Sequence, residues 1–243
     1  MTGKSRAAVL PPSLRGRLGV VGAVAALVVT VLAVLFAGHS RPSRVDSWIV
    51  APTADSVRPP LRYVADTLDF LGEPTGSVMA VLAAVTCCLL LRRPRAAVLM
   101  VAGVSLAVGT ATLLKQLVGR TIHGPENLSY PSGHTTFFTA LAFVAALLAT
   151  DRLGLGSRAG TSLVLAATLV AGAAMGWAEV ALGAHYPTDA LGGWCTALAV
   201  VPATAWLVDR AADRVAAPAG HPPGGPARPQ HPKHPPRRPN HAS

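Results

Sequence analysis

The sequence predicts an all-α fold, a polytopic membrane bundle of six transmembrane helices with both termini cytoplasmic. The first observation is composition: of 243 residues, 51% are apolar and only 13% are charged, which is too little charge to cover a soluble domain of this size. The second is that the charges are bunched and separated by long uncharged runs. These runs exclude disorder, a collagen-like repeat and a disulfide scaffold as descriptions of the whole chain.

Six uncharged apolar runs are long enough to cross a bilayer, which takes roughly 17 to 25 residues. They cover residues 18–38, 74–91, 96–114, 133–150, 159–182 and 188–208. In lipid, each run can satisfy its backbone only as a helix. The first run follows four basic residues, as in a secretion signal. Because its 21 uncharged residues exceed a signal-peptide core and no small-residue cleavage motif follows, we interpret it as a retained anchor.

The basic residues between the runs predict the orientation. With the N-terminus inside, the Arg-rich turn at 92–95, the 151–158 loop and the C-terminal tail all lie in the cytoplasm, and each is net basic. The 39–73 loop then lies outside, with four Arg against five acids. Both termini are therefore expected to be cytoplasmic.

The chain divides into a cytoplasmic N-terminal segment (1–17), a six-helix membrane domain (18–210) and a tail (211–243). The tail is rich in Pro and His and lacks the apolar residues of a core, so we expect a disordered basic segment rather than a metal site. In the outer loop, apolar residues at helical spacing from Leu61 to Leu71 predict a short interfacial helix. We interpret it as a connector rather than a lid.

The distribution of charge, the positions of the cysteines and the excess of Arg over Lys give three further predictions. The net charge of +10 lies between and beyond the apolar runs rather than on one soluble face, so the expected partner is the lipid bilayer and not a nucleic acid. Three cysteines, Cys87, Cys88 and Cys195, sit inside apolar runs without metal-ligand spacing and are interpreted as small core residues. The excess of Arg over Lys, with many Ala, Gly and Pro, is typical of GC-rich coding and indicates a bacterial source.

Polar side chains gather at one predicted membrane level. They are Lys115 and Arg120 after the third run, Ser132, Gly133 and His134 at the start of the fourth, Glu179 at the end of the fifth, and His185 with Asp189 at the start of the sixth. For any one of these residues, a side chain that extends its polar end to the membrane surface would be a sufficient explanation. Charges near the membrane are costly unless they face a polar cavity, so their convergence from three loops predicts a functional site on the extracytoplasmic side.

Their chemistry favours phosphoryl transfer. His185 and Asp189 are four residues apart at a helix start, so their side chains share one face and can bond. A carboxylate on one ring nitrogen fixes the tautomer and leaves the other nitrogen free to attack. His134 could then serve as general acid toward a leaving oxygen.

The other residues provide an anion site. Lys115, Arg120, the Ser132 hydroxyl and the amides at the start of the fourth helix supply positive charge and hydrogen-bond donors. Such a set suits a phosphoryl group, whose charge spreads over its equatorial oxygens in the transition state.

Two motifs make a family resemblance specific. Residues 130–134 read Tyr-Pro-Ser-Gly-His, and residues 185–189 read His-Tyr-Pro-Thr-Asp, followed by Gly192-Gly193. They resemble the second and third motifs of the type 2 phosphatidic acid phosphatase superfamily. The stretch from Lys115 to Arg120 is similar to the start of the first motif, and the six-helix layout fits the family over most of the chain.

The resemblance implies a membrane lipid phosphatase that needs no metal or other cofactor. His185 would be the nucleophile that forms a phosphohistidine, Asp189 would orient it, and His134 would protonate the leaving group. The phosphate would be held by Lys115, Ser132 and the Gly133 amide.

The chain departs from the family at two arginines. The family's first motif ends in Arg-Pro, but the corresponding positions here are Ile122 and His123. Its third motif has Ser-Arg before the histidine, whereas Glu179 stands here in place of the arginine. We expect Arg120, helped by His123, to replace the missing arginines. Glu179 is expected to anchor Arg120 or Lys115, or to recognise a hydroxyl or cationic part of the substrate.

The function expected from the sequence is therefore an integral membrane phosphatase acting on a lipid phosphate or diphosphate at the extracytoplasmic face. Polyprenyl diphosphates, phosphatidic acid and glycosylated polyprenyl phosphates are the candidate substrates, and the sequence does not choose among them. The alternatives are a lipid phosphotransferase, in which an alcohol replaces water, and a non-catalytic lipid-phosphate-binding membrane protein. The sequence indicates no oligomeric state.

Overall fold

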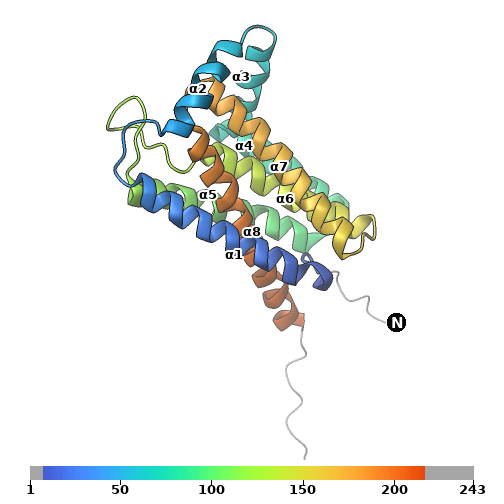
Figure 1. The fold of residues 1–243 in the computed structure, drawn as a ribbon. Coiled ribbons are helices and arrows are strands. Elements are labelled where there is room, and N and C mark those ends of the chain that lie inside the picture. Colours follow the sequence, from blue (N-terminus) through green and yellow to red (C-terminus); the bar gives the residue numbers. More distant parts are fainter. Residues whose placement is uncertain (1–7, 217–243) are drawn as a thin grey trace, which may run out of the picture.

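The computed structural model describes residues 8–216, and eight α-helices make up most of this part of the chain (Figure 1). In order they are α1 (Pro12–Phe36), α2 (Arg44–Ser56), α3 (Leu61–Gly72), α4 (Pro74–Leu90), α5 (Pro94–Val118), α6 (Gly133–Arg152), α7 (Ser157–Ala181) and α8 (Pro187–Ala216). Within residues 8–216 the β-structure is an isolated bridge between Thr121 and Leu128. The predicted all-α class is confirmed.

The predicted spans correspond to five single helices and one bent pair of helices. The helices α1, α5, α6, α7 and α8 are each long and apolar enough to cross a membrane. By contrast α4 has 17 residues, about 25 Å at 1.5 Å per residue, against a hydrocarbon core of about 30 Å. It qualifies as a span only together with α3, from which it is bent by 73°. The sixth candidate span is therefore the α3–α4 elbow.

The outer loop holds two helices where the sequence predicted one. The predicted helix from Leu61 is present as α3. The additional helix, α2, begins with a capping box in which Ser43 Oγ accepts from the Asp46 amide and Asp46 Oδ2 accepts from the Ser43 amide. The α2 helix was not predicted from the sequence, because Pro52, a residue type that ordinarily ends or kinks a helix, lies inside it.

Two helices extend beyond the predicted spans. The first begins at Pro12 rather than residue 18, and α8 continues through Ala216, beyond the predicted span end at 208. Residues 1–7 and 217–243, which include most of the predicted tail, lie outside the described part of the chain.

The long helices pack around a shared apolar core. The α8 helix lies against α1, α5 and α6, and α6 also packs along α7. Fully buried core residues include Leu14, Phe143, Leu147 and Val201. Many other valines and leucines face outward, as expected for helices whose solvent is lipid.

Both ends of the described chain meet at one end of the bundle. The amides of Val9 and Leu10 donate to the buried carboxylate of Asp209 on α8 at 2.8 and 3.0 Å. At the same end Arg93, in the α4–α5 turn, pairs with Asp151 of α6 at 2.6 Å. The described parts of the four segments predicted to be cytoplasmic, residues 8–17, 92–95, 151–158 and 211–216, therefore share one end of the bundle, opposite α2 and α3 (Figure 1).

Candidate active site

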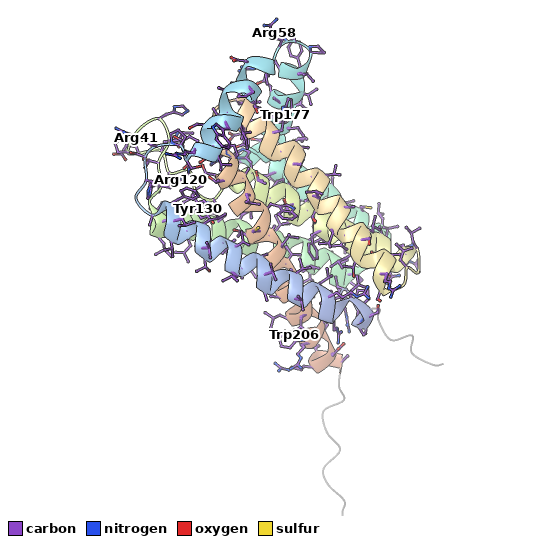
Figure 2. All side chains as sticks on the ribbon, viewed as in Figure 1. Arg41, Arg58, Arg120, Tyr130, Trp177 and Trp206 are labelled. Carbon is purple, nitrogen blue, oxygen red and sulfur yellow. The ribbon has the colours of Figure 1, made fainter. Side chains whose placement is uncertain are left out.

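The predicted site residues gather at the end of the bundle that carries α2 and α3. Figure 2 shows Arg120 and Tyr130 at this end, together with Arg41 and Arg58, whereas Trp206 lies at the opposite end. Three connections supply the site: the α5–α6 loop, the α7–α8 loop and the α3–α4 elbow.

The start of α6 is hydrogen-bonded to the start of α8. Ser132 is the N-cap of α6, and its Oγ accepts from the Thr135 amide at 3.2 Å. Its own amide donates to the Asp189 carbonyl at 3.0 Å. The backbones can approach because residue 193 is glycine: a Cβ there would overlap the Ser132 carbonyl. The two family-like motifs therefore lie against each other.

His185 and Asp189 lie side by side, as their spacing predicts. His185 Nδ1 is 3.7 Å from Asp189 Oδ2, which is ion-pair distance and longer than a hydrogen bond. Asp189 Oδ2 also accepts from the Tyr186 amide at 3.0 Å. Burial lowers the pKa of His185, and Lys115 and His134 lower it further against the opposing effect of Asp189. A neutral imidazole is the form that can act as a nucleophile.

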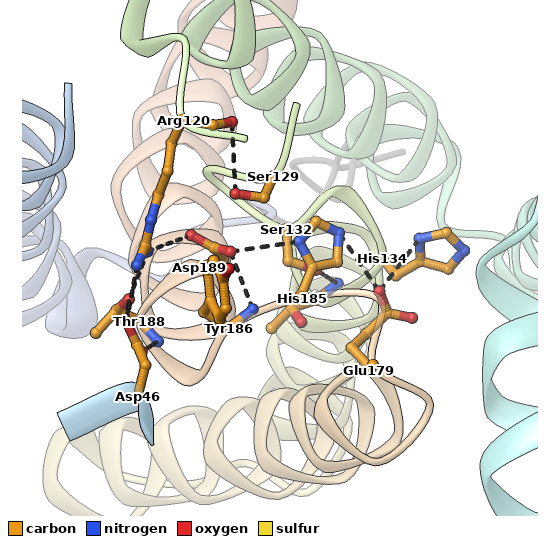
Figure 3. Close-up of polar contacts among 12 residues, drawn as sticks. Asp46, Arg120, Ser129, Ser132, His134, Glu179, His185, Tyr186, Thr188 and Asp189 are labelled. Carbon is orange, nitrogen blue, oxygen red and sulfur yellow. Dashed lines mark hydrogen bonds and ion pairs between the residues drawn. The ribbon is translucent and has the colours of Figure 1, made fainter. Parts of the chain in front are cut away.

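Two imidazoles face the same carboxylate oxygen (Figure 3). Glu179 Oε2 lies 3.5 Å from His185 Nε2 and 3.9 Å from His134 Nδ1. Glu179 is 1% exposed, and its Oε1 has no hydrogen-bond partner among the described residues. Lys115, in the last turn of α5, interacts electrostatically with Glu179 and both histidines. Two imidazoles therefore converge on one carboxylate oxygen, and the Lys115 ammonium is close enough to act on all three side chains electrostatically.

The α3–α4 elbow covers His134. Asp69 Oδ1 and Glu73 Oε1 lie 3.8 and 3.9 Å from His134 Nε2. The imidazole rests against Gly72, where a Cβ would overlap the ring. Ligand atoms of Asp69, Glu73 and His134 all lie within 4.8 Å of one another, so within the described residues this is the group that could hold a metal ion. Sequence reasoning missed both acids, because acids on an amphipathic helix ordinarily face water.

Arg120 contacts Asp189 and is too deeply buried to contact a phosphate. Its side chain is 0% exposed. Nη1 donates to Asp189 Oδ1 and to Thr188 Oγ1, both at 2.6 Å, and Nη2 donates to Asp46 Oδ2 at 2.7 Å. Two expectations are thereby corrected: Arg120 does not face the phosphate site, and its carboxylate partners are Asp46 and Asp189 rather than Glu179.

His123 also differs from its expected role. It is exposed, and its Nε2 donates to the Gly183 carbonyl at 2.8 Å. The contact joins the α5–α6 loop to the α7–α8 loop, so His123 holds two site loops together and does not assist Arg120.

Comparisons with known proteins agree with this architecture. The model of the PAP2 superfamily matches residues 112–213, a range that holds all nine site residues predicted from the sequence. A search of curated protein sequences gave no match. A crystal structure described as the first transmembrane PAP2 type phosphatidylglycerolphosphate phosphatase from Bacillus subtilis shares the fold, with a TM-score of 0.62 and 20% identity over 80% of this chain and 96% of that chain. The family that the sequence motifs resemble is therefore the same one whose model matches residues 112–213, the PAP2 superfamily.

Proposed function

We propose that this protein is an integral membrane phosphatase that hydrolyses a lipid phosphate or diphosphate through a phosphohistidine on His185. The observation that supports it best is the convergence of His185 Nε2 and His134 Nδ1 on one oxygen of Glu179, at 3.5 and 3.9 Å. A phosphoryl group that displaces the Glu179 carboxyl from this point would contact both imidazoles, with Lys115 and the first turn of α6 beside it.

In the first step, the lone pair of His185 Nε2 attacks phosphorus and the bond from phosphorus to the lipid oxygen breaks. His134 transfers a proton to that oxygen, so the lipid leaves as an alcohol or as a shorter phosphate. Asp189 stabilises the positive charge that develops on the His185 ring. Lys115 and the amides of Gly133 and its neighbours offset the charge on the equatorial oxygens. The Ser132 hydroxyl fixes this first turn.

In the second step, the neutral His134 takes a proton from a water molecule, and the resulting hydroxide attacks phosphorus. The bond from phosphorus to His185 breaks, inorganic phosphate leaves, and His185 returns to its neutral form. Imidazole and ammonium groups supply the nucleophile, the acid and the positive charge, so the mechanism needs no metal ion.

The proposed location is the cell membrane, with the site on the extracytoplasmic side. It rests on the basic loops at the opposite end of the bundle. A cysteine at Ala54 of α2, in a background without the natural cysteines, should react with an impermeant thiol reagent in intact cells, and one at Ala159 of α7 should not. Both positions are exposed. The reverse labelling would place the site in the cytoplasm.

The activity is tested with purified protein in detergent, assayed with a chelator for phosphate release. The panel contains polyprenyl diphosphate, phosphatidic acid and a glycosylated polyprenyl phosphate, and His185→Gln is the matched control. We expect release from at least one substrate by the wild type and none by the variant. Binding without turnover would favour a non-catalytic protein. Phosphate transfer to an added alcohol in place of release would favour a phosphotransferase.

A further inference from the structure

A fully buried guanidinium lies directly behind the proposed catalytic pair. Arg120 is sandwiched between two aromatic rings, with its Cζ 4.0 Å from the Phe36 ring centroid and 4.6 Å from that of Tyr186. Its two terminal nitrogens bind different carboxylates, Asp189 and Asp46. Buried charges that are paired and hydrogen-bonded in this way hold one geometry, and removing a partner leaves an uncompensated charge.

Asp46 comes from outside the matched family region. It is 0% exposed, and it accepts from the Thr188 amide at 3.0 Å, from Thr188 Oγ1 at 3.1 Å and from Arg120 at 2.7 Å. Burial raises the pKa of Asp46, but hydrogen bonds from Thr188, Arg120 and Ser43 outweigh burial and leave the pKa below its ordinary value. Asp46 therefore carries a full negative charge in this buried position.

The second carboxylate, that of Asp46, changes the net charge of the cluster it forms with Arg120 and Asp189. If Arg120 faced Asp189 alone, the pair would be neutral, and the guanidinium would draw the carboxylate charge away from His185. With Asp46 added, two carboxylates share one guanidinium, and the cluster keeps one net negative charge. That charge stays available to stabilise the His185 ring as it becomes positive on phosphorylation.

We infer that Asp46 is a positioning residue for the reaction: acting through Arg120 and Thr188, it holds Asp189 toward His185 and keeps its negative charge available to the nucleophile (Figure 3). The helix α2 of the outer loop is then part of the active-site framework. The inference rests on the proposed function for the identity of the nucleophile.

If Asp46 only docked α2 onto the bundle, its role would be purely structural, and the expected results would differ. Its substitution would then change the amount or stability of folded protein and leave the chemistry of the folded molecules unaltered. A positioning role changes kcat, the pH dependence of kcat/KM and the titration of His185. His185 is faced by Asp189 from α8, Glu179 from α7, His134 from α6 and Lys115 from α5, and Asp46→Asn leaves all four in place.

The first test compares Asp46→Asn with Asp66→Asn. Asp66 pairs with Arg62 at 3.3 Å on the exposed face of α3, so its variant removes an equal charge from the same outer loop. We expect Asp46→Asn to lower kcat by about tenfold to a hundredfold with little change in KM. The acid limb of its kcat/KM profile should move to lower pH, because Arg120 then withdraws charge from Asp189. Asp66→Asn should match the wild type.

The second test asks whether Asp46 acts through Arg120. In a double-mutant cycle, Asp46→Asn should cost much less in an Arg120→Met background than in the wild type. Arg120→Met alone should raise the pKa of His185, because it frees Asp189, whereas Asp46→Asn should lower it. Fully additive losses, or shifts of the same sign, would overturn the inference.

The His185 titration is read without turnover, by NMR of protein labelled with 15N on histidine rings and assigned with His185→Gln. If Asp46→Asn does not fold, Thr188→Val removes the hydroxyl between Arg120 and Asp46, and a smaller downward shift is expected. An unchanged His185 titration in a folded variant would overturn the inference. Wild-type protein that turns over no lipid phosphate, while its His185 titration still moves with Asp46, would instead overturn the proposed function.

Discussion

Glu179 Oε2 and His185 Nε2 lie 3.5 Å apart, with Glu179 buried to 1% exposure. The nitrogen proposed to attack phosphorus therefore faces a carboxylate where the family resemblance implies an arginine. A phosphate bound at this nitrogen would stand next to the Glu179 side chain, and an ionised carboxyl there would repel the phosphate in a partly desolvated site. Lys115 offsets part of this repulsion, because its ammonium interacts with Glu179.

Glu179→Gln should therefore strengthen phosphate binding. The amide keeps the shape of the side chain and removes the charge, so KM for a lipid phosphate should fall about tenfold. The control is Glu126→Gln, which removes an exposed acid in the α5–α6 loop and should leave KM unchanged. A higher KM in Glu179→Gln would show that the carboxylate binds a hydroxyl or cationic part of the substrate.

His134→Ala should separate substrates by leaving group. A lipid phosphate needs a proton on its departing oxygen, whereas an aryl phosphate leaves without one. The kcat/KM of the variant, which reports the phosphorylation step, should fall about a hundredfold or more with the lipid substrate and much less with the aryl substrate. Equal losses with both, measured as kcat/KM, would assign His134 to phosphate binding rather than to proton transfer.

Gly72→Ala should disturb His134 from the elbow. An added Cβ would overlap the His134 ring, so the imidazole or the elbow must move, and we expect about a tenfold or larger loss of kcat with the lipid phosphate. Gly109→Ala on α5 is the matched control, because nothing lies within 4 Å of a Cβ there. Wild-type kcat in Gly72→Ala would show that the elbow does not hold the ring.

The parts of the fold that the sequence predicted depend on local patterns. Uncharged apolar runs locate the long helices, and the motif spacing brings His185 and Asp189 together on one helix face. The contacts of Arg120 depend on tertiary packing instead. Asp46 is 74 residues away from it in the chain, and no local pattern connects an acid in the first turn of α2 to a buried guanidinium.

The contact between the α3–α4 elbow and His134 also could not be predicted from local sequence patterns. Asp69 sits at helical spacing among apolar residues, which indicates a surface helix and says nothing about a histidine on α6. The 73° bend between α3 and α4 brings this acid to the site, and bends between helices depend on packing rather than on periodicity.

Asp209→Asn should destabilise the opposite end of the bundle. Asp209 accepts from the amides of Val9 and Leu10 and lies 3.5 Å from Arg95, with its side chain 2% exposed. Breaking a buried pair of this kind costs about 3 kcal/mol, seen as a lower thermal midpoint in detergent with kcat preserved in the folded fraction. Asp213→Asn is the control, since Asp213 also pairs with Arg95 but is 64% exposed. An unchanged midpoint in Asp209→Asn would show that this contact does not hold the N-terminal segment.

The most direct test is to trap the phosphoryl group during turnover. Wild-type protein is mixed with a labelled aryl phosphate, quenched within milliseconds in base, where phosphohistidine survives, and digested for mass spectrometry. The account predicts a phosphoryl group on His185, lost in His185→Gln and retained in His134→Ala. A phosphoryl group on His134, or steady phosphate release by His185→Gln, would contradict it.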